Sequence, residues 1–336
     1  MAVRWGIVGC GDVTEVKSGP GFQQANGSAL VAVMRRDRAK AEDYALRHGV
    51  ARAYDRADAL VGDPEVDAVY VATPPSTHLD IALLAAKAGK PCLVEKPMAM
   101  SHAECVTMID AFRSHGVPLW VAYYRRALPR FLDVRARLRA GAIGALTSVH
   151  VQVTEPLASG ETLANWRFDP AVAGAGLFLD LASHCIDLLD FFAGPIADAR
   201  GCAINTGGAY PAEDVTAASF VFSSGVVGTG IWNFNASEKT DVITLTGTRG
   251  TILTPVFTDG DVVIVTGGLR NVLPVRNPPH VHQPLIQTIV DELGGRGRCE
   301  STGVSGARAT WVMDRCLERY RTVHGSMNST RVPSGS

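Results

Sequence analysis

The chain has almost no net charge, because its 32 Lys and Arg residues are balanced by 33 Asp and Glu residues. Without an excess of one sign it has no overall field that would attract nucleic acid or an anionic membrane, so neither partner is expected. Its apolar runs are short and interrupted, and none is expected to reach the roughly 20 residues of a transmembrane helix. Residues 1–8 show no charged leader with a cleavage site. We therefore expect a cytoplasmic protein.

The cysteines also lack a pattern. There are seven of them, an odd number, scattered along the chain without any C-x-x-C spacing. This distribution argues against a disulfide framework and against a zinc site, so we expect reduced thiols and no metal. The length of 336 residues is too great for one ordinary domain and suits two, each able to bury its own core.

The most informative feature present is the turn Gly9-Cys10-Gly11, which directly follows the apolar run Val3 to Val8. A continuous apolar run is typical of a parallel strand buried on both faces. Gly9 permits a tight turn, and Gly11 lets the backbone approach a phosphate, so this segment predicts a site for the pyrophosphate of a dinucleotide. The alternative is an ordinary glycine-rich turn between a strand and a loop.

The residues after the turn belong to the same predicted site. Asp12 and Val13 open a helix whose first N–H groups would face the anion. Thr14 stands where the G-x-G-x-x-G pattern has its third glycine, which predicts slightly looser packing of that helix on the strand.

A second apolar strand, Ala29 to Met34, ends at the position that usually contacts the adenosine ribose. Arg35-Arg36-Asp37 follows, where an NAD-binding fold normally places a carboxylate for the ribose 2′-hydroxyl. Two guanidinium groups suit a 2′-phosphate instead, so NADP is the predicted cofactor and NAD the second choice. In the alternative interpretation the arginines begin a solvated helix with Asp37 as its N-cap, and NAD would then be the expected cofactor.

The first 122 residues alternate between strand and helix. Predicted strands are 3–8, 29–34, 53–54, 68–72, 92–94 and 119–122, and predicted helices are 39–48, 57–61, 78–88 and 102–115. Repeated β-α units with short connections imply a doubly wound parallel sheet, and ligands bind at the carboxyl ends of such strands. Thr73 and Pro74 lie at one such end, and Glu95-Lys96-Pro97 lies at another.

Past residue 145 the pattern changes to alternating strands separated by hairpin turns. The predicted strands are 147–154, 217–222, 226–235, 241–245, 251–255 and 262–265. We expect a mostly antiparallel open sheet, with helices 178–192 and 284–293 on one face and a subunit interface on the other. The predicted domains are therefore 1–122 for the dinucleotide and 123–325 for substrate and oligomerisation, followed by a polar tail at 326–336.

Lys96 is the candidate for proton transfer. A lysine at the end of a central strand beside a cofactor cleft is badly placed for a purely structural residue, and partial desolvation would let it donate or accept a substrate proton. Pro97 fixes the turn, and Glu95 is the expected ion-pair partner. An exposed lysine at a strand end is the alternative.

A polar stripe on an apolar helix forms the second candidate cluster. Asp180, His184 and Asp187 follow the i, i+4, i+7 spacing and share one face. A histidine between two carboxylates is a plausible general base for an alcohol proton. Metal binding and a hydrogen-bonded cluster without catalytic function are the alternatives.

Taken together, these motifs resemble the Gfo/Idh/MocA oxidoreductase family over essentially the whole chain. The resemblance rests on six elements in order: Gly9-Cys10-Gly11, Glu95-Lys96-Pro97, Ala122 to Arg126 with Pro129, Asn165-Trp166-Arg167, Asp180-x-x-x-His184, and Gly247-Thr248-Arg249-Gly250. Two departures are Thr14, and Gly174-Ala175-Gly176 where the family often has three glycines.

The resemblance implies a Rossmann domain, a C-terminal α/β domain and hydride transfer between a nicotinamide and a sugar or polyol carbon. It implies catalytic roles for Lys96, Asp180 and His184 and a substrate contact for Asp187. Gln152 is a further candidate for substrate contact. Weaker candidates, for which a structural role is the alternative, are Tyr124, Arg126, Trp166, Arg167 and His282. We expect a homodimer or homotetramer formed through the C-terminal sheet. A non-catalytic cofactor sensor or scaffold is the alternative function.

Overall fold

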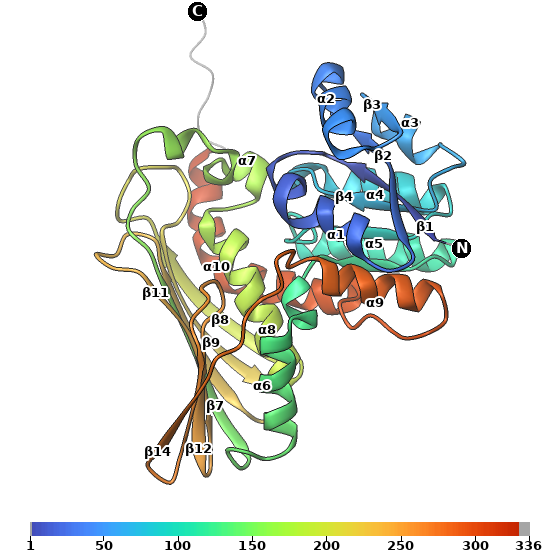
Figure 1. Cartoon of the computed structure of the whole chain (residues 1–336). Coiled ribbons are helices and arrows are strands. Elements are labelled where there is room, and N and C mark those ends of the chain that lie inside the picture. The colour runs from blue at the N-terminus through green and yellow to red at the C-terminus, as the bar shows by residue number, and fades with distance from the viewer. Residues whose placement is uncertain (1, 329–336) are drawn as a thin grey trace, which may run out of the picture. The chain divides into compact units, whose positions relative to one another are not determined.

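The computed structural model describes residues 2–328 and divides into two compact units (Figure 1). The first comprises the chain up to Asp133 together with Val275–Thr310, and the second comprises Val134–Pro274 together with the residues from Trp311 onward. The sequence placed all of 123–325 in one domain. The structure instead groups a late segment of 36 residues, 275–310, with the N-terminal part.

The first unit is built on a six-stranded parallel sheet in the order β3-β2-β1-β4-β5-β6. This is the order of a dinucleotide-binding doubly wound fold, as the sequence predicted. Its strands are β1 (Val3–Val8), β2 (Ser28–Met34), β3 (Arg52–Tyr54), β4 (Ala68–Val71), β5 (Cys92–Val94) and β6 (Leu119–Val121).

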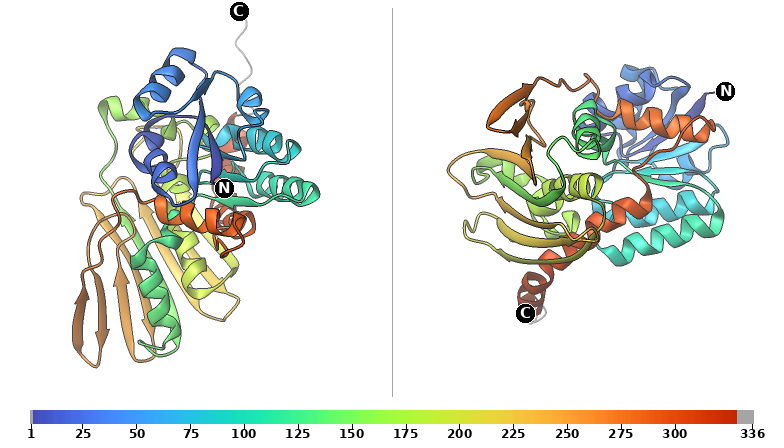
Figure 2. Two further views of the ribbon diagram at one scale, coloured as in Figure 1. Left: turned by 45° about the vertical axis from the view of Figure 1, so that its right-hand side comes forward. Right: turned by 90° about the horizontal axis from the view of Figure 1, so that it is seen from below.

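Helices cover both faces of this sheet, as the right-hand view of Figure 2 shows for α9 on one face and α4 and α5 on the other. They are η1 (Thr14–Ser18), α1 (Gly19–Gln24), α2 (Arg38–His48), α3 (Ala57–Val61), η2 (Pro75–Thr77), α4 (His78–Lys87), α5 (His102–His115), η3 (Tyr124–Ala127) and α9 (Gln283–Leu293). Local signals set several of their ends: Ser101 caps α5 by accepting the Glu104 N–H, and Gly116 ends it in the left-handed conformation.

Helix α9 was expected on the C-terminal sheet, and that expectation is wrong. It packs on α1, where a Cβ added to Gly21 would lie 3.1 Å from the backbone nitrogen of Gln283. The chain that follows α9 pairs with β6, because the Val121 N–H donates to the Ser301 carbonyl at 3.1 Å and the Ser301 hydroxyl donates to the Val121 carbonyl at 2.7 Å. The late segment is therefore part of the dinucleotide-binding core.

The second unit is built on an eight-stranded sheet in the order β14-β13-β12-β11-β7-β10-β9-β8. Only the β7–β10 pair is parallel, and the other described pairs are antiparallel, as predicted for a mostly antiparallel sheet. The strands are β7 (Leu146–Thr154), β8 (Ile196–Ile204), β9 (Val215–Phe222), β10 (Val227–Asn233), β11 (Thr240–Gly247), β12 (Gly250–Thr254), β13 (Val262–Thr266) and β14 (Leu269–Leu273).

One face of this sheet is covered by helix α8 (Ser183–Ala193), whose side chains pack on the buried Val149, Val151 and Val153 of β7. The remaining helices are α6 (Pro129–Arg139), which crosses from one unit to the other, η4 (Gly160–Ala164), η5 (Trp166–Phe168), α7 (Pro170–Ala173), η6 (Phe178–Ala182) and α10 (Gly303–Asn328). The opposite face of the sheet is open.

The helical run Pro170–Ala193 is long and apolar enough, by length and composition, to cross a membrane. From the sequence we expected no apolar run of this length. Within the fold 72% of the most apolar window is buried, which is the environment of a core helix. The apolarity of this run is therefore explained by its burial in the second unit.

Helix α10 continues through Asn328, so the first three residues of the tail predicted at 326–336 belong to a helix. Residues 329–336 of that tail lie outside the described part of the chain.

Candidate functional site

The glycine turn lies where β1 ends. Gly9 has φ +99°, and a Cβ there would come within 2.8 Å of the Ala72 carbonyl carbon, so a side chain is excluded by both conformation and space. Gly11 differs, because a Cβ built on it meets nothing within 4 Å. The backbone at Gly11 thus borders an open space of the kind that a phosphate needs beside a helix N-terminus.

Thr14 is accommodated by a change in the helix. Its side chain is fully buried, and its hydroxyl donates to the Gly11 carbonyl at 2.7 Å. The turn that begins at Thr14 is a π-helix, in which the Gly19 N–H donates to the Thr14 carbonyl, and the Tyr44 hydroxyl donates to the same oxygen at 2.9 Å. The wider turn makes room for a side chain where the predicted pattern has glycine.

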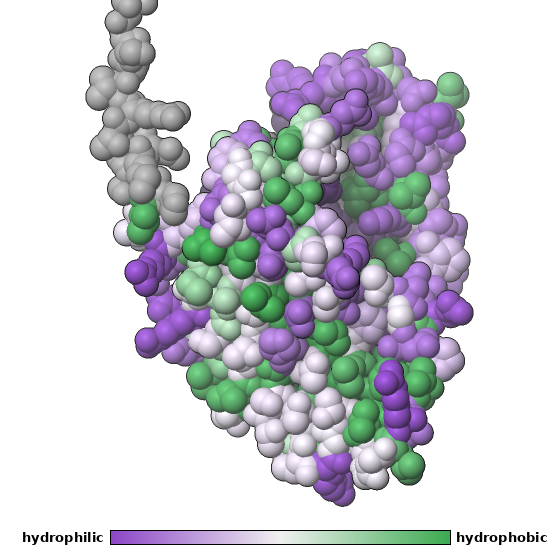
Figure 3. All heavy atoms as spheres, turned by 90° about the vertical axis from the view of Figure 1, so that its left-hand side faces the viewer, coloured by the Kyte–Doolittle hydropathy of each residue, from purple (hydrophilic) through white to green (hydrophobic). Residues whose placement is uncertain are grey.

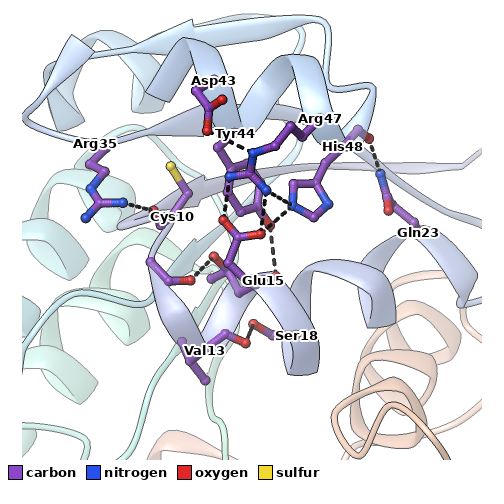
Figure 4. A network of polar contacts seen from close by, with 12 residues as sticks. Cys10, Val13, Glu15, Ser18, Gln23, Arg35, Asp43, Tyr44, Arg47 and His48 are labelled. Atoms are coloured by element: carbon purple, nitrogen blue, oxygen red, sulfur yellow. Dashed lines mark hydrogen bonds and ion pairs between the residues drawn. The ribbon is translucent and has the colours of Figure 1, made fainter. Parts of the chain in front are cut away.

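A charged network ties this turn to helix α2 (Figure 4). The carboxylate of Glu15 accepts hydrogen bonds from both terminal nitrogens of Arg47, at 2.9 and 2.7 Å, and lies 2.7 Å from Nε2 of His48. The Arg47 hydrogen bonds, helped by that of His48, lower the pKa of Glu15 to about 2 although burial acts to raise it. Arg47 also bonds Asp43 at 2.8 Å. The network fixes the first turn after Gly9 and Gly11.

The residues that follow β2 divide into two roles. Nη1 of Arg35 donates to the Cys10 carbonyl at 3.3 Å, which holds this guanidinium over the glycine turn (Figure 4). Asp37 is the N-cap of α2: its Oδ1 accepts the Lys40 N–H at 3.2 Å and its Oδ2 lies 3.6 Å from the Lys40 ammonium. Arg36 is exposed. Burial raises the pKa of the Cys10 thiol to about 11, against the opposing charge of Arg35.

A buried histidine joins the other two segments that follow strands of this sheet, Thr73-Pro74 after β4 and Glu95-Lys96-Pro97 after β5. Nε2 of His78 lies 2.8 Å from the Thr73 carbonyl, and its Nδ1 lies 3.1 Å from the Pro97 carbonyl. Pro74 follows Thr73, and the Lys96–Pro97 peptide bond is cis. Sequence reasoning read His78 only as a helix residue. The sequence feature that could have indicated its role is a histidine at the start of α4, three residues after Pro75.

Glu95 is buried beneath Lys96. Its carboxylate accepts hydrogen bonds from the Tyr70 hydroxyl, from Nε2 of His282 at 3.1 Å and from the backbone N–H of Lys96 at 3.1 Å. Burial alone would raise the pKa of Glu95, but the hydrogen bond and charge of His282, the Tyr70 hydroxyl and the charge of Lys96 lower it to about 2. The sequence named Lys96 as the partner of Glu95 and ranked His282 only as a weak substrate contact.

Tyr124 and Arg126 lie on η3 of the first unit and are both buried. The ring of Tyr124 packs against the imidazole of His282 with centroids 4.4 Å apart, and the guanidinium of Arg125 lies 4.8 Å from the Tyr124 centroid. Tyr124 was predicted to contact substrate. Its packing identifies it first as a support for His282.

The second unit assembles a separate set of predicted residues. Nε of Arg167 lies 3.2 Å from Oδ2 of Asp180, and the same guanidinium lies 4.7 Å from the centroid of the Trp166 ring. Asn165 orders this element, because its side chain accepts the Arg167 N–H at 3.1 Å. The Asn165-Trp166-Arg167 element and Asp180 therefore meet, although they were selected independently.

His184 and Asp187 follow one helical turn later, on α8, and both are buried. Positions three apart on a helix are neighbours on one face. The ring of Phe257 lies edge-on to the imidazole of His184, with centroids 6.1 Å apart. Phe257 is held by the carboxylate of Asp241, which accepts its backbone N–H at 2.7 Å. Asp180 itself lies on the π-helical turn η6.

The loop that leads into this helix is tied to a buried acid. The Gly176 N–H donates to Oε1 of Glu213 at 3.0 Å, and a Cβ on Gly176 would lie 2.5 Å from the Glu213 carbonyl oxygen. Gly174 has φ +91° and ends α7. Burial raises the pKa of Glu213 to about 7, partly offset by backbone hydrogen bonds and by Arg321. The Gly-Ala-Gly loop therefore has two glycines that its geometry requires.

Gln152 is not brought to these residues. Side chains alternate along β7, so Gln152 and His150 lie on the face opposite to Val151 and Val153, which pack beneath the helices. Asp180, His184 and Asp187 belong to the covered side. Gln152 therefore lies on the other face of the sheet, and the structure does not bring it to Asp180, His184 and Asp187.

Within residues 2–328 no group of three or more His, Cys, Asp and Glu side chains is arranged to hold a metal ion. All seven cysteines are free, and only Cys202 is exposed.

The open space at Gly11, the helix that begins beside it and the guanidinium of Arg35 fit a nicotinamide dinucleotide. A doubly wound sheet with this turn, joined to a unit that carries a buried Asp-His pair on one helix, defines a dinucleotide-binding oxidoreductase.

Comparison with known proteins gives the same class. Residues 3–123 match the model of the oxidoreductase family with an NAD-binding Rossmann fold, and residues 131–253 match the GFO/IDH/MocA C-terminal domain. Oxidoreductase P35 of Formosa agariphila is 37% identical over 317 residues, which are 93% of this chain and 97% of that protein. The 1,5-anhydro-D-fructose reductase of Ensifer adhaerens is 29% identical over 311 residues, 90% of this chain and 92% of that protein.

Solved structures agree on the fold. Levoglucosan dehydrogenase in complex with NADH superposes with a TM-score of 0.86 at 20% identity, over 96% of this chain and 98% of that one. The chain belongs to the GFO/IDH/MocA oxidoreductase family. The predicted family, the two-part fold and the assignment as an enzyme are thereby confirmed, and the sensor or scaffold alternative is set aside.

Proposed function

We propose that this protein is an NADP-dependent dehydrogenase or reductase that interconverts a hydroxyl group and a ketone on a sugar or polyol. The observation that supports NADP over NAD is that Arg35 and Asp37, which follow β2, have different contacts. The only carboxylate in the Arg35-Arg36-Asp37 segment caps α2, whereas Arg35 reaches over the glycine turn. A cation in that place favours a 2′-phosphate, and a carboxylate committed to a helix cap is poorly available to a 2′-hydroxyl.

The residues that would hold the cofactor come from the first unit. Gly9, Cys10, Gly11, Asp12 and Val13 would bind the pyrophosphate, Arg35 and Arg36 the adenosine phosphate, and Thr73, Pro74, Glu95 and Lys96 border the nicotinamide end. The nicotinamide supplies the acceptor or donor of hydride when bound.

The proton chemistry falls to three side chains. In oxidation the imidazole of His184 takes the proton of the substrate hydroxyl, and in reduction it returns that proton to the carbonyl oxygen. Asp180 orients the imidazole and stabilises its charged form. The ammonium of Lys96 donates a hydrogen bond to the same substrate oxygen and stabilises developing alkoxide charge.

Substrate contacts are proposed for Asp187, Arg126, Trp166 and Arg167. Carboxylate and guanidinium groups hydrogen-bond vicinal hydroxyls, and a partly exposed Trp provides an apolar face for a sugar ring. The named relative that acts on 1,5-anhydro-D-fructose makes anhydro sugars and ketoses the first compounds to test.

The test is cofactor binding followed by turnover. Titration with NADPH and with NADH, read by nicotinamide fluorescence, should give tighter binding of NADPH by about tenfold or more, the value of one charge-assisted contact. Oxidation of NADPH should then be observed with at least one member of a panel of ketoses and anhydro sugars. Equal affinity for the two cofactors would overturn the NADP assignment, and absence of any turnover would overturn the substrate class.

We also propose that the chain forms a homo-oligomer through the open face of the C-terminal sheet. Figure 3 looks onto this side of the second unit, where apolar and weakly polar side chains predominate. Val221 and Val227 are cross-strand partners that are both about half exposed, at 44% and 52%, and Ile204 of the neighbouring strand is 53% exposed. Exposed apolar residues on an open sheet face are typical of an interface.

The cytoplasm remains the proposed compartment. Its support is the set of seven free cysteines, which suits a reducing environment.

A further inference from the structure

A polar cluster lies buried directly behind the turn that carries Lys96. Glu95 and His282 are 8% and 1% exposed, and Tyr70 is fully buried. One carboxylate oxygen of Glu95 faces both the Tyr70 hydroxyl and Nε2 of His282, and the other accepts the backbone N–H of Lys96 at 3.1 Å. Three donors therefore converge on one carboxylate, which is the arrangement that keeps a buried carboxyl group ionised.

His282 reaches this cluster from a distant part of the chain. It is 187 positions from Glu95 and stands at the N-cap of α9. Helix α9 is fixed independently, since the Asn26 N–H donates to the side chain of Gln287 at 2.8 Å and Gly21 permits close approach of Gln283. Tyr124 packs on the other part of the imidazole. These contacts fix the position of His282, which is buried and donates to Glu95 from one defined place.

Glu95 acts on Lys96 in two ways. Its second oxygen fixes the backbone N–H of Lys96, and therefore the direction in which the lysine side chain leaves the strand. Its negative charge is also attracted by the Lys96 ammonium, which helps to lower the pKa of Glu95. A carboxylate held still in a dry environment acts more strongly on a nearby charge than one in water.

We propose that Glu95 and His282 form a positioning pair for Lys96, in which His282 clamps the Glu95 carboxylate so that it fixes the lysine backbone and holds a negative charge beside the ammonium. The kinetic part of this inference rests on the proposed role of Lys96 in proton transfer. The charge relationship between Glu95 and Lys96 does not, because it can be measured without substrate or cofactor.

The direct test is the reactivity of the Lys96 amine. The cofactor-free protein is treated with a trace of acetic anhydride at pH 7.5, and acetylation of Lys96 is quantified by peptide mass spectrometry relative to exposed Lys87. In Glu95→Gln the backbone N–H of Lys96 loses its charged acceptor and the ammonium loses the attraction of the carboxylate, so Lys96 should be acetylated about threefold or more faster relative to Lys87. An unchanged ratio in a folded Glu95→Gln protein would overturn the proposal.

The second test is kinetic, and it changes the position of the Glu95 carboxylate while leaving its charge in place. His282→Ala should lower kcat about tenfold or more with little change in the KM for NADPH, and His282→Gln, which restores a donor near the position of Nε2, should recover a large part of kcat. His280→Ala is the matched control, because His280 lies two residues earlier, is only half-buried and contacts the Val16 carbonyl and not Glu95. A merely structural role predicts instead that His282→Ala and His282→Gln lose the same activity, or that kcat and cofactor affinity fall together.

Folding is checked by circular dichroism and by binding of NADPH. Should His282→Ala fail to fold, Tyr70→Phe removes one donor from the same carboxylate and keeps the ring. Because it leaves the charge of Glu95 in place and loosens only its position, it should lower kcat by about threefold or more with little change in the KM for NADPH. The two proposals fail differently. Loss of the acetylation effect with normal, Lys96-dependent turnover overturns the positioning pair alone, whereas a normal acetylation effect with no turnover on any sugar overturns the proposed function alone.

Discussion

Nε of Arg167 lies 3.2 Å from Oδ2 of Asp180, so the element that carries Trp166 is joined by an ion pair to the helix that carries His184. The pair is partly exposed, with 40% and 21% of the two side chains accessible, and pairs of that kind contribute little to stability. Its value is positional, since it orients the carboxylate one turn before His184.

Arg167→Met should therefore impair catalysis more than folding. We expect kcat/KM to fall about tenfold to a hundredfold, the worth of one charge-assisted hydrogen bond, with unchanged NADPH affinity and a change in unfolding free energy of less than about 1 kcal/mol. Steady-state kinetics and urea unfolding measure the two quantities. Arg200→Met is the control, since Arg200 pairs with Asp198 at 3.6 Å on an exposed strand. Equal losses in both variants would show that the Arg167 pair has no special role.

The two glycines of the phosphate turn should respond differently to a methyl group. Gly11→Ala adds a Cβ to open space, so the melting temperature should stay within a few degrees of the wild type while NADPH affinity falls at least tenfold. Gly9→Ala places a Cβ 2.8 Å from Ala72 at φ +99°, so the fold itself should be destabilised by about 1–3 kcal/mol. Calorimetry and fluorescence titration test both. A Gly11→Ala protein that binds NADPH normally would contradict the placement of the cofactor.

Cofactor choice should depend on Arg35. Arg35→Ala should weaken NADPH binding about tenfold to a hundredfold and change NADH binding less than threefold, because only the 2′-phosphate loses a charged contact. Arg38→Ala is the matched control, since Arg38 bonds Glu42 at 2.7 Å on the surface of α2. Parallel losses for both cofactors would mean that Arg35 supports the glycine turn through Cys10 and does not select the phosphate.

Local sequence patterns predicted the first sheet well, because its strands are continuous apolar runs separated by short helices with clear caps. Helix α3 at Ala57–Val61 and helix α5 at His102–His115 have the predicted bounds. Strands β8 and β14 were missed, since Arg200 and Cys202 interrupt one and the other is largely exposed. Helix α10 was also missed, because its first turns contain glycine, serine and threonine and little apolar periodicity.

What the local patterns could not provide was the partner of a residue far away in the sequence. The return of α9 to the first unit depends on contacts such as Trp120 with Glu292, 172 positions apart at 3.3 Å. The same is true of His282, which sequence reasoning ranked low because nothing near it indicates Glu95. The alternation of side chains along β7 could be predicted from the sequence. The face of the sheet that the helices cover could not, and for that reason Gln152 was assigned to the site.

Glu213 should make stability depend on pH. Its pKa is about 7 in the fold against 4.5 ordinarily, so its contribution is fully present below pH 4.5, is lost as the pH rises from 4.5 to about 7, and is level above that. Glu213→Gln should match the wild type near pH 4.5 and exceed it at pH 8 by up to about 3 kcal/mol. Glu95 titrates below this window, because its pKa is about 2.

Urea unfolding at pH 4.5, 6 and 8 measures the Glu213 effect. Glu161→Gln, at an exposed position, serves as the control and should follow the wild type at each pH. A constant difference between Glu213→Gln and the wild type across the three pH values would contradict the raised pKa.

The open sheet face should hold the oligomer together. Val227→Asp places a charge opposite Val221 on that face, and we expect light scattering after size exclusion to show a smaller assembly than the wild type. Leu46→Asp, at an 84% exposed position on α2, should leave the assembly unchanged. A wild type that is monomeric at micromolar concentration, or a Val227→Asp protein of unchanged mass, would rule out this interface.

The central claim is that Lys96 and His184 handle the substrate proton in an NADP-dependent reaction. Its most direct test is the turnover of NADPH with a ketose or anhydro sugar by the wild type, Lys96→Met and His184→Asn, with NADPH binding measured on each. We predict that His184→Asn binds NADPH within threefold of the wild type and Lys96→Met, which alters the proposed nicotinamide end, within about tenfold. Both should lose at least a hundredfold in kcat, a lower bound for removal of a general acid or base. Wild-type turnover in either variant, or tight NADPH binding with no turnover by any of the three proteins, would contradict the claim.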